Sequence, residues 1–337
     1  MQANPFLYLL TMSGFSEFSQ FLTHHSSDVV LASLKHLLSF SESYATEIFQ
    51  AGLFPHIISL LSHDNVEIIH NALSILINLS SDADLQSHLS PSISVLIEMV
   101  VSGNYTSFLP LVFMLLSNLT VSEDCCRSLM QENTPLEGSF LIRLLIELAR
   151  PVQDPTNDQI AFAASVLANL SRLKSATDFI MRKHPSLLNH IISQLSSPSI
   201  RRRGGCISAL RNLLFDDSSH FGLLADPQDK LWNAIKNRLE PTNSLESDAF
   251  IRKSLVDCWY LLSSTEDVIK ILLGFNSIDL ASTLKTFLED SLSSTVGQDI
   301  DDVKETIVTL DKIIQRLDEH NFVDVHVREL PDENITV

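Results

Sequence analysis

The residue types that carry out catalysis occur in this chain without the spacing that catalysis requires. The sequence contains no G-x-S-x-G, P-loop, H-E-x-x-H or C-x-x-C motif. Its 12 histidines are scattered, and the neighbours His24 and His25 cannot both face one metal ion from a helix. The 4 cysteines form no metal-binding pair and are typical of reduced thiols in a cytosolic or nuclear protein. We therefore expect a protein that is not an enzyme and that has no metal site and no cofactor.

Four asparagines offer binding chemistry instead, because each lies near the end of an apolar segment with helical spacing. The segments are ALSILINLS (72–80), LVFMLLSNLT (111–120), AASVLANLS (163–171) and ISALRNLLF (207–215), with Asn78, Asn118, Asn169 and Asn212. A side-chain amide both donates and accepts hydrogen bonds, so it matches the peptide group of an extended partner. The same amide can also form hydrogen bonds to backbone groups of an adjacent segment of this chain, since the four segments are similar enough to be copies of one repeat. The sequence leaves both interpretations open and makes these asparagines candidate partner-binding residues.

Three consecutive arginines, Arg201, Arg202 and Arg203, fall in the first turn of a predicted helix. The helix dipole disfavours cations at that end, which suggests a use beyond local stability. Arg252 holds the corresponding place one repeat later. Because a guanidinium group binds carboxylates bidentately, we predict that these arginines contact an acidic segment of a partner. The alternative is that they pair with acids of this chain, such as Asp158, Asp216 or Asp248.

The segments that position these residues form a repeat. The four asparagines are spaced by 40, 51 and 43 residues, and periods of about 40–47 residues are typical of armadillo or HEAT solenoids. Weaker copies at 31–41 and 255–264 place Ser39 and Ser263 at the asparagine position, which predicts about six repeats. Residues 45–81 predict three helices, with a break at Gly52, a start near Pro55 and a third helix over about 65–80. This pattern resembles the armadillo repeat.

The resemblance to armadillo proteins implies that the third helices line an inner groove, where their asparagines bind the backbone of a partner. Nuclear-import adaptors of this fold carry a tryptophan four residues before the asparagine. This chain departs from that pattern, because it has Ser74, Met114, Ser165 and Ser208 at those places. The departure argues against an import adaptor.

We expect an all-α, armadillo/HEAT-type α-solenoid that forms a single domain over residues 1–320. The repeats cover about 14–290, and none of the linkers between them is long enough to separate domains. Apolar residues at helical spacing predict a C-terminal capping helix over 299–320, with Ile300, Val303, Ile307, Leu310, Ile314 and Leu317 on one stripe. Residues 321–337 lack a strong helical pattern and are predicted to form a loose tail.

Charge and hydropathy restrict the partners. The 337-residue chain is 45% hydrophobic and carries a net charge of −18, so its surface repels the phosphates of a nucleic acid. The N-terminus lacks the basic region of a signal peptide, and the longest apolar run, 108–116, is too short to cross a bilayer. We therefore expect no nucleic acid and no membrane as partners. We expect a monomer in the cytoplasm, with the nucleus as an alternative location.

Two motifs in the C-terminal half carry a more specific resemblance. RRRGGCISALRNLLFD (201–216) and DAFIRKSLVDCWYLL (248–262) resemble the Hgh family of armadillo-like proteins. The matching residues are Arg201, Arg202, Arg203, Gly204, Leu210, Arg211, Asn212, Asp248, Ile251, Arg252 and Lys253. The connector between the motifs, 238–247, is shorter than the proline-rich one often found in the family.

The resemblance implies a cofactor that helps to fold translation elongation factor 2 together with the cytosolic ring chaperonin. Two other functions compete with this one. The first is a generic armadillo adaptor that binds extended segments in transport or cytoskeletal assembly. The second is an enzyme, or the regulatory subunit of one.

Overall fold

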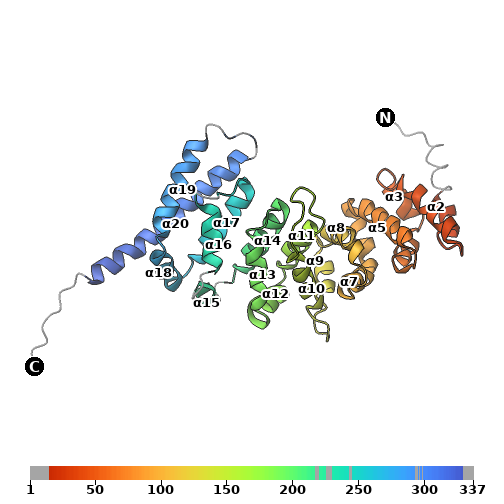
Figure 1. The fold of residues 1–337 in the computed structure, drawn as a ribbon, viewed down its shortest axis with the longest axis horizontal. Coiled ribbons are helices and arrows are strands. Elements are labelled where there is room, and N and C mark those ends of the chain that lie inside the picture. Colours follow the sequence, from red (N-terminus) through yellow and green to blue (C-terminus); the bar gives the residue numbers. More distant parts are fainter. Residues whose placement is uncertain are drawn as a thin grey trace, which may run out of the picture. The chain divides into compact units, whose positions relative to one another are not determined.

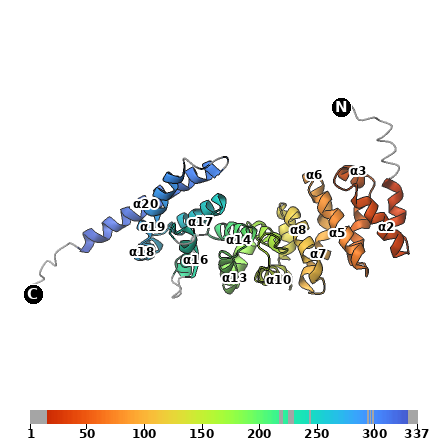
Figure 2. The same cartoon turned by 45° about the horizontal axis from the view of Figure 1, so that its top comes forward.

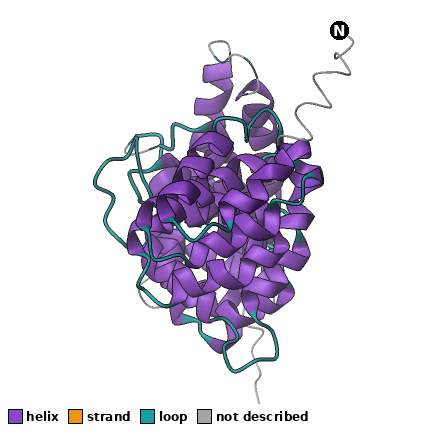
Figure 3. Cartoon of the chain, turned by 90° about the vertical axis from the view of Figure 1, so that its right-hand side faces the viewer, coloured by secondary structure: helices purple, strands orange, loops and turns teal. Residues whose placement is uncertain are grey.

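The computed structural model describes residues 15–216, 220–224, 230–242, 245–292, 295, 297 and 299–328. Helix makes up 75% of the structure, and the described residues contain no strand (Figure 3). The predicted all-α fold is therefore confirmed. In this part of the chain, no helix combines the length and the apolar character needed to cross a membrane.

The chain divides into two compact units. Unit 1 comprises Met1–Arg150 and Asn157–Ala176, and unit 2 comprises Pro151–Thr156 and Thr177–Val337. The single solenoid expected over residues 1–320 stays a prediction.

Unit 1 is a series of short helices (Figure 1). Its α-helices are α2 (Ser27–Leu38), α3 (Ala45–Gln50), α4 (Phe54–Ser59), α5 (Val66–Ser80), α6 (Ala83–Gln86), α7 (Ile93–Val101), α8 (Leu109–Leu119), α9 (Glu123–Met130), α10 (Ser139–Leu148) and α11 (Ala161–Leu170). The short 3-10 helices are η1 (Leu60–Ser62), η2 (Ser87–Ser92) and η3 (Thr106–Phe108).

The best-defined repeat of unit 1 folds as the sequence predicts. Helix α3 ends next to Gly52, whose φ of 72° suits glycine, and Pro55 lies in the first turn of α4. Helix α5 begins at an N-cap, Asn65, whose side chain accepts a hydrogen bond from the backbone N–H of Glu67 at 2.8 Å. These three local signals set the boundaries of the repeat.

The third helices form the core of unit 1. Helix α5 packs against both α2 and α8 (Figure 2). Helix α8 in turn packs against α11. Leu73, Leu76 and Leu79 of α5 are fully buried between these neighbours. Burial of each such leucine contributes about 1.5–3 kcal/mol relative to an exposed position. Because each helix buries its apolar face on the next one, the repeats stabilise one another.

Unit 2 continues the alternation of helices and short connectors. It contains the π-helix η4 (Phe179–Lys183), α13 (Ser186–Gln194), α14 (Ile200–Leu213), α15 (His220–Leu224), α16 (Lys230–Leu239), α17 (Ala249–Leu262), α18 (Glu266–Gly274), α19 (Ser277–Ser291) and α20 (Asp299–Arg328). Helix α12 (Lys174–Asp178) contains the boundary between the units. Helix α14 packs against α17, and α17 packs against α20.

The last helix differs from the sequence prediction in two ways. Helix α20 continues to Arg328, beyond the predicted end at 320, and residues 329–337 of the expected tail lie outside the described residues. Its buried stripe consists of Val303, Thr306, Leu310, Ile313 and Leu317. Ile300, Ile307 and Ile314 are only half-buried, because the stripe follows a spacing of three and four residues around Thr306 and Ile313.

Candidate protein-binding site

Three of the four predicted asparagines bond to the preceding repeat. Their side-chain amide nitrogens each donate to a hydroxyl group of the neighbouring repeat of unit 1, which lies 37, 38 or 49 positions earlier. The bonds join Asn78 to Ser41 at 2.8 Å, Asn118 to Ser80 at 2.9 Å and Asn169 to Thr120 at 3.0 Å. The hydroxyl residues are fully buried and the asparagines half-buried. Of the two interpretations left open by the sequence, the structure supports the contact between repeats.

Each of these hydroxyl groups also bonds within its own helical turn. The hydroxyl hydrogen is donated to a backbone carbonyl three or four residues earlier, while its oxygen accepts the amide of the next repeat. The carbonyls belong to Leu38 for Ser41 at 2.9 Å, to Ile77 for Ser80 at 2.7 Å and to Leu116 for Thr120 at 2.7 Å. We call this chain of contacts the amide–hydroxyl ladder. It gives a physical reason for the recurring N-L-S/T sequence.

The ladder uses only part of each amide. In the part of unit 1 that the structure describes, the side-chain oxygens of Asn78, Asn118 and Asn169 accept no hydrogen bond. Each half-buried amide therefore retains an acceptor for the N–H of a partner's backbone. Asn212 is also half-buried, near the C-terminal end of α14, and its predicted role in binding stays a prediction.

In unit 2 an arginine of α20 makes the corresponding contact. Arg316 donates to the Ser263 hydroxyl at 3.4 Å and to the Tyr260 carbonyl at 3.1 Å, and its guanidinium lies 3.8 Å from the centre of the Tyr260 ring. Ser263 donates to the Tyr260 carbonyl, as the ladder hydroxyls do, so it occupies the hydroxyl position. Placing Ser263 at the asparagine position was therefore wrong by two residues, because Leu261 lies there.

A pocket of about 210 Å³ adjoins the last asparagine of unit 1. Its lining residues are Val121, Glu123, Cys126, Asn169, Arg172 and Leu173. Arg172 fixes one wall by donating to the backbone carbonyls of Thr120 at 3.0 Å and Val121 at 3.2 Å. Val121 is 60% exposed, so an apolar side chain of a partner has direct access to it. The pocket and the free amide oxygen of Asn169 together suit a polypeptide with one apolar side chain.

The predicted arginine site separates into exposed and buried members. Arg201 is exposed, whereas Arg202 is only 2% and Arg203 only 6% exposed. Arg252 is half-buried and donates to the backbone carbonyl of Glu246 at 2.7 Å. The predicted partner contact by Arg202 and Arg203 is therefore corrected, since both side chains lie inside unit 2. Arg201 remains the accessible candidate.

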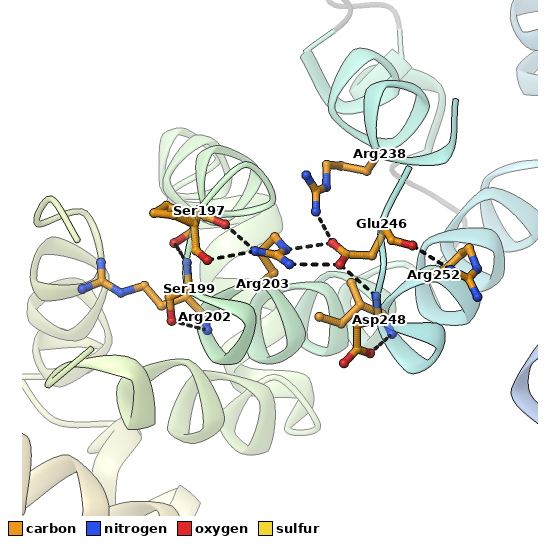
Figure 4. Close-up of polar contacts among 10 residues, drawn as sticks. Ser197, Ser199, Arg202, Arg203, Arg238, Glu246, Asp248 and Arg252 are labelled. Carbon is orange, nitrogen blue, oxygen red and sulfur yellow. Dashed lines mark hydrogen bonds and ion pairs between the residues drawn. The ribbon is translucent and has the colours of Figure 1, made fainter. Parts of the chain in front are cut away.

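Arg203 binds a carboxylate that the sequence analysis did not identify. Its guanidinium holds both oxygens of Glu246, with Nε to Oε2 at 2.7 Å and Nη2 to Oε1 at 2.9 Å (Figure 4). Nη1 donates to the backbone carbonyl of Ser197 at 2.7 Å, and Arg238 also bonds Glu246. Glu246 is fully buried. The short connector between α16 and α17 thus carries the centre of a buried ion cluster.

Electrostatics favour the ionised form of Glu246. Burial alone would raise the pKa of this carboxyl group, but hydrogen bonds from Arg203 and Arg238 outweigh it and lower the pKa. Two acids named as alternative partners also bond within unit 2: Asp216 pairs with Arg182 at 2.6 Å, and Asp248 caps α17 by accepting from the N–H of Ile251 at 2.9 Å. No sequence signal reveals Glu246, because its partner Arg203 is 43 positions away.

The thiols do not form a reactive site. All four cysteines are free and buried. Burial raises the pKa of Cys126 to about 11 and that of Cys206 to about 12, and it raises the pKa of Cys125 and Cys258 as well. Within the described ranges, no group of three His, Cys, Asp or Glu residues is arranged to hold a metal ion.

Comparison with known proteins places this geometry in context. A family model described as a domain of unknown function, DUF383, matches residues 104–252, which contain the arginine motif and end at Arg252. Proteins named "Protein HGH1 homolog" are similar to the chain. The one from Dictyostelium discoideum is 24% identical over 228 residues, and the match covers 65% of this chain and 64% of that protein. The one from Xenopus tropicalis is 25% identical over 267 residues, covering 72% and 73%.

Solved structures support the fold. A computationally designed armadillo repeat protein for modular peptide recognition matches with a TM-score of 0.59 and 14% identity, over 73% of this chain and 99% of that one. The fold is an armadillo-type α-solenoid, as the repeat spacing predicts.

Proposed function

We propose that this chain, which belongs to the Hgh family of armadillo-like proteins, is a non-enzymatic, protein-binding chaperone cofactor. Its client is translation elongation factor 2, which it helps to fold in the cytoplasm together with the cytosolic chaperonin. The observation that carries the proposal is the similarity to HGH1 homologues across a region that includes the arginine motif and the DUF383 match. The client and the chaperonin come from the family resemblance.

The geometry supports a binding mode for such a client. Asn78, Asn118 and Asn169 each retain an amide oxygen that suits the backbone N–H of an extended segment. The pocket beside Asn169 offers Val121 and Leu173 to an apolar side chain. The designed armadillo proteins that share this fold recognise peptides, which is consistent with this mode. The client is then held without covalent chemistry and without ATP.

A generic adaptor is the second candidate, since an armadillo-type solenoid that presents free amide oxygens serves any extended segment. The two functions differ in the partner and not in the geometry. Co-purification with elongation factor 2 and chaperonin supports the first, whereas co-purification with transport or cytoskeletal proteins alone supports the second.

The test is a substitution at the pocket that leaves the amide–hydroxyl ladder intact. Val121→Glu places a carboxylate at a 60% exposed residue of the pocket lining, and we expect it to weaken capture of elongation factor 2 about tenfold. Val66→Glu is the matched control, because Val66 is 63% exposed at the start of α5 and does not line the pocket. Equal capture by both variants would contradict the binding mode, and no capture by the unaltered chain would contradict the function.

A further inference from the structure

A second pocket, in unit 2, has the chemistry of a site for a cationic side chain. Its volume is about 220 Å³, below the roughly 300–1,000 Å³ of typical small-molecule sites, so it suits a single side chain. It is lined by Lys236, Glu240, Pro241, Thr242, Phe275, Asn276, Asp279, Leu280 and Thr283. These residues come from the C-terminal end of α16, the connector that follows it, the turn between α18 and α19, and the N-terminal half of α19.

The turn that carries Phe275 is held in place by local contacts. Asn276 adopts a left-handed conformation with φ of 56°, which allows α19 to begin directly after α18. The Ser277 hydroxyl donates to the carbonyl of Leu272 at 2.7 Å and is buried. The Phe275 ring stacks on Trp232 with centroids 6.1 Å apart and planes 19° apart. The aromatic wall of the pocket is therefore fixed before any ligand binds.

Among the described residues of unit 2, the two carboxylates of the pocket have no partner. Neither Glu240 nor Asp279 forms an ion pair or accepts a hydrogen bond within the part of unit 2 that the structure describes. Other acids of unit 2 do so, for example Asp257 with Lys253 at 3.2 Å. Asp279 lies in the first turn of α19, where the helix dipole favours an acid. Glu240 follows the C-terminal end of α16, where the dipole does not stabilise a negative charge.

We propose that this pocket binds an arginine side chain from a basic segment of a partner protein. The planar guanidinium stacks on an aromatic ring such as Phe275, and its several N–H groups donate to carboxylates such as those of Glu240 and Asp279. Two carboxylates against the single ammonium group of Lys236 leave the pocket net negative. The net charge of −18 attracts a basic segment to the whole surface and repels nucleic acid.

The proposal does not depend on the identity of the client. A segment bound beside Asn169 and an arginine bound beside Phe275 occupy pockets in different units. If the pocket did not bind arginine, the proposed function would be unaffected. If the chain did not capture elongation factor 2, binding of arginine to this pocket could still be tested.

The experiment measures binding of a hexa-arginine peptide to the full chain by calorimetry and by tryptophan fluorescence. Trp232 contacts Phe275, so occupation of the pocket should change its emission. The variant Glu240→Gln with Asp279→Asn should bind hexa-arginine about fivefold to tenfold more weakly and keep the thermal midpoint. The control, Asp267→Asn with Asp290→Asn, removes the same charge from a helix start and a helix end outside the pocket, and should stay within about twofold.

A substitution that removes a positive charge from the pocket tests the same electrostatic attraction. Lys236→Gln removes the cation that opposes the ligand and should strengthen binding about twofold to threefold, whereas Lys304→Gln on α20 should not. If both pairs of acid substitutions weakened hexa-arginine binding equally, the overall charge of the protein would explain the binding. That result would overturn the proposal. Hexalysine or spermine binding as tightly as hexa-arginine would overturn it as well, and so would a tryptophan emission that does not change on binding.

Discussion

Replacing Glu246 with alanine removes the centre of the ion cluster in unit 2. The glutamate side chain is fully buried, and the Arg203 side chain that it binds is 8% exposed. Breaking a buried ion pair by removing one partner costs about 3–5 kcal/mol, because the other charge stays buried without compensation. Arg203 keeps two backbone carbonyls as acceptors, those of Ser197 at 2.7 Å and Pro198 at 3.2 Å. We therefore expect a loss near the lower end, about 3 kcal/mol of unfolding free energy.

Tryptophan fluorescence during urea unfolding measures the stability of unit 2, which contains Glu246. The chain has 2 tryptophans, Trp232 on α16 and Trp259 on α17, and both belong to unit 2. These helices flank the connector that carries Glu246. Glu240→Ala is the control, because this acid lies in the same connector without an ion pair among the described residues, and it should change stability by less than about 0.5 kcal/mol.

A second variant separates the lost pairing from a general disruption of the connector. Arg203→Met combined with Glu246→Leu removes both charges, and apolar replacement of a buried pair is often neutral or stabilising. We expect the double variant to regain most of the stability that Glu246→Ala loses. A Glu246→Ala protein as stable as the unaltered chain would refute the reasoning, and so would a double variant less stable than the single one.

Other consequences of the structure are open to direct measurement. Alanine substitutions of Asn118 and Ser80 should couple by about 1 kcal/mol in a double-mutant cycle followed by circular dichroism, and additive effects would show that their 2.9 Å bond is not stabilising. Because the pKa of Glu246 is lowered from its ordinary 4.5, its contribution to stability is complete above that pH and is lost as the pH falls through the lower folded value. Tryptophan-monitored stability should therefore fall more steeply below about pH 4.5 in the unaltered chain than in the variant without the Arg203–Glu246 pair, and parallel profiles would contradict this. The 4 buried thiols should not react with a disulfide reagent until the chain unfolds, and fast labelling of the native protein would contradict their burial and raised pKa.

The helices and repeats could be predicted because their signals are local. The break at Gly52, the proline near the start of α4 and the cap at Asn65 each act within one turn of the chain. The 3.6-residue periodicity of apolar side chains likewise needs no knowledge of the neighbouring helix. Signals of this kind predicted the fold class and the boundaries of the best-defined repeat. They could not decide whether the asparagines bind a partner or form hydrogen bonds to the neighbouring repeat.

The contacts between repeats were harder to predict, since they join residues far apart in sequence. The hydroxyl that accepts the hydrogen bond from Asn118 belongs to Ser80, in the N-L-S ending of the previous repeat. Comparing the repeats in the sequence could therefore have identified this partner. Glu246 could not be identified in this way, because nothing in the connector marks it as the partner of Arg203. The helix dipole disfavours the arginine run in the first turn of α14, and pairing with Glu246 accounts for the position of Arg203.

The most direct test of the account is whether the purified chain captures translation elongation factor 2 through the pocket beside Asn169. The measurement is the affinity for newly unfolded elongation factor 2, compared between the unaltered chain, Val121→Glu and Val66→Glu. The account predicts capture by the unaltered chain and by Val66→Glu, with affinity about tenfold lower for Val121→Glu. Capture that is absent, or equal in all three proteins, would contradict it.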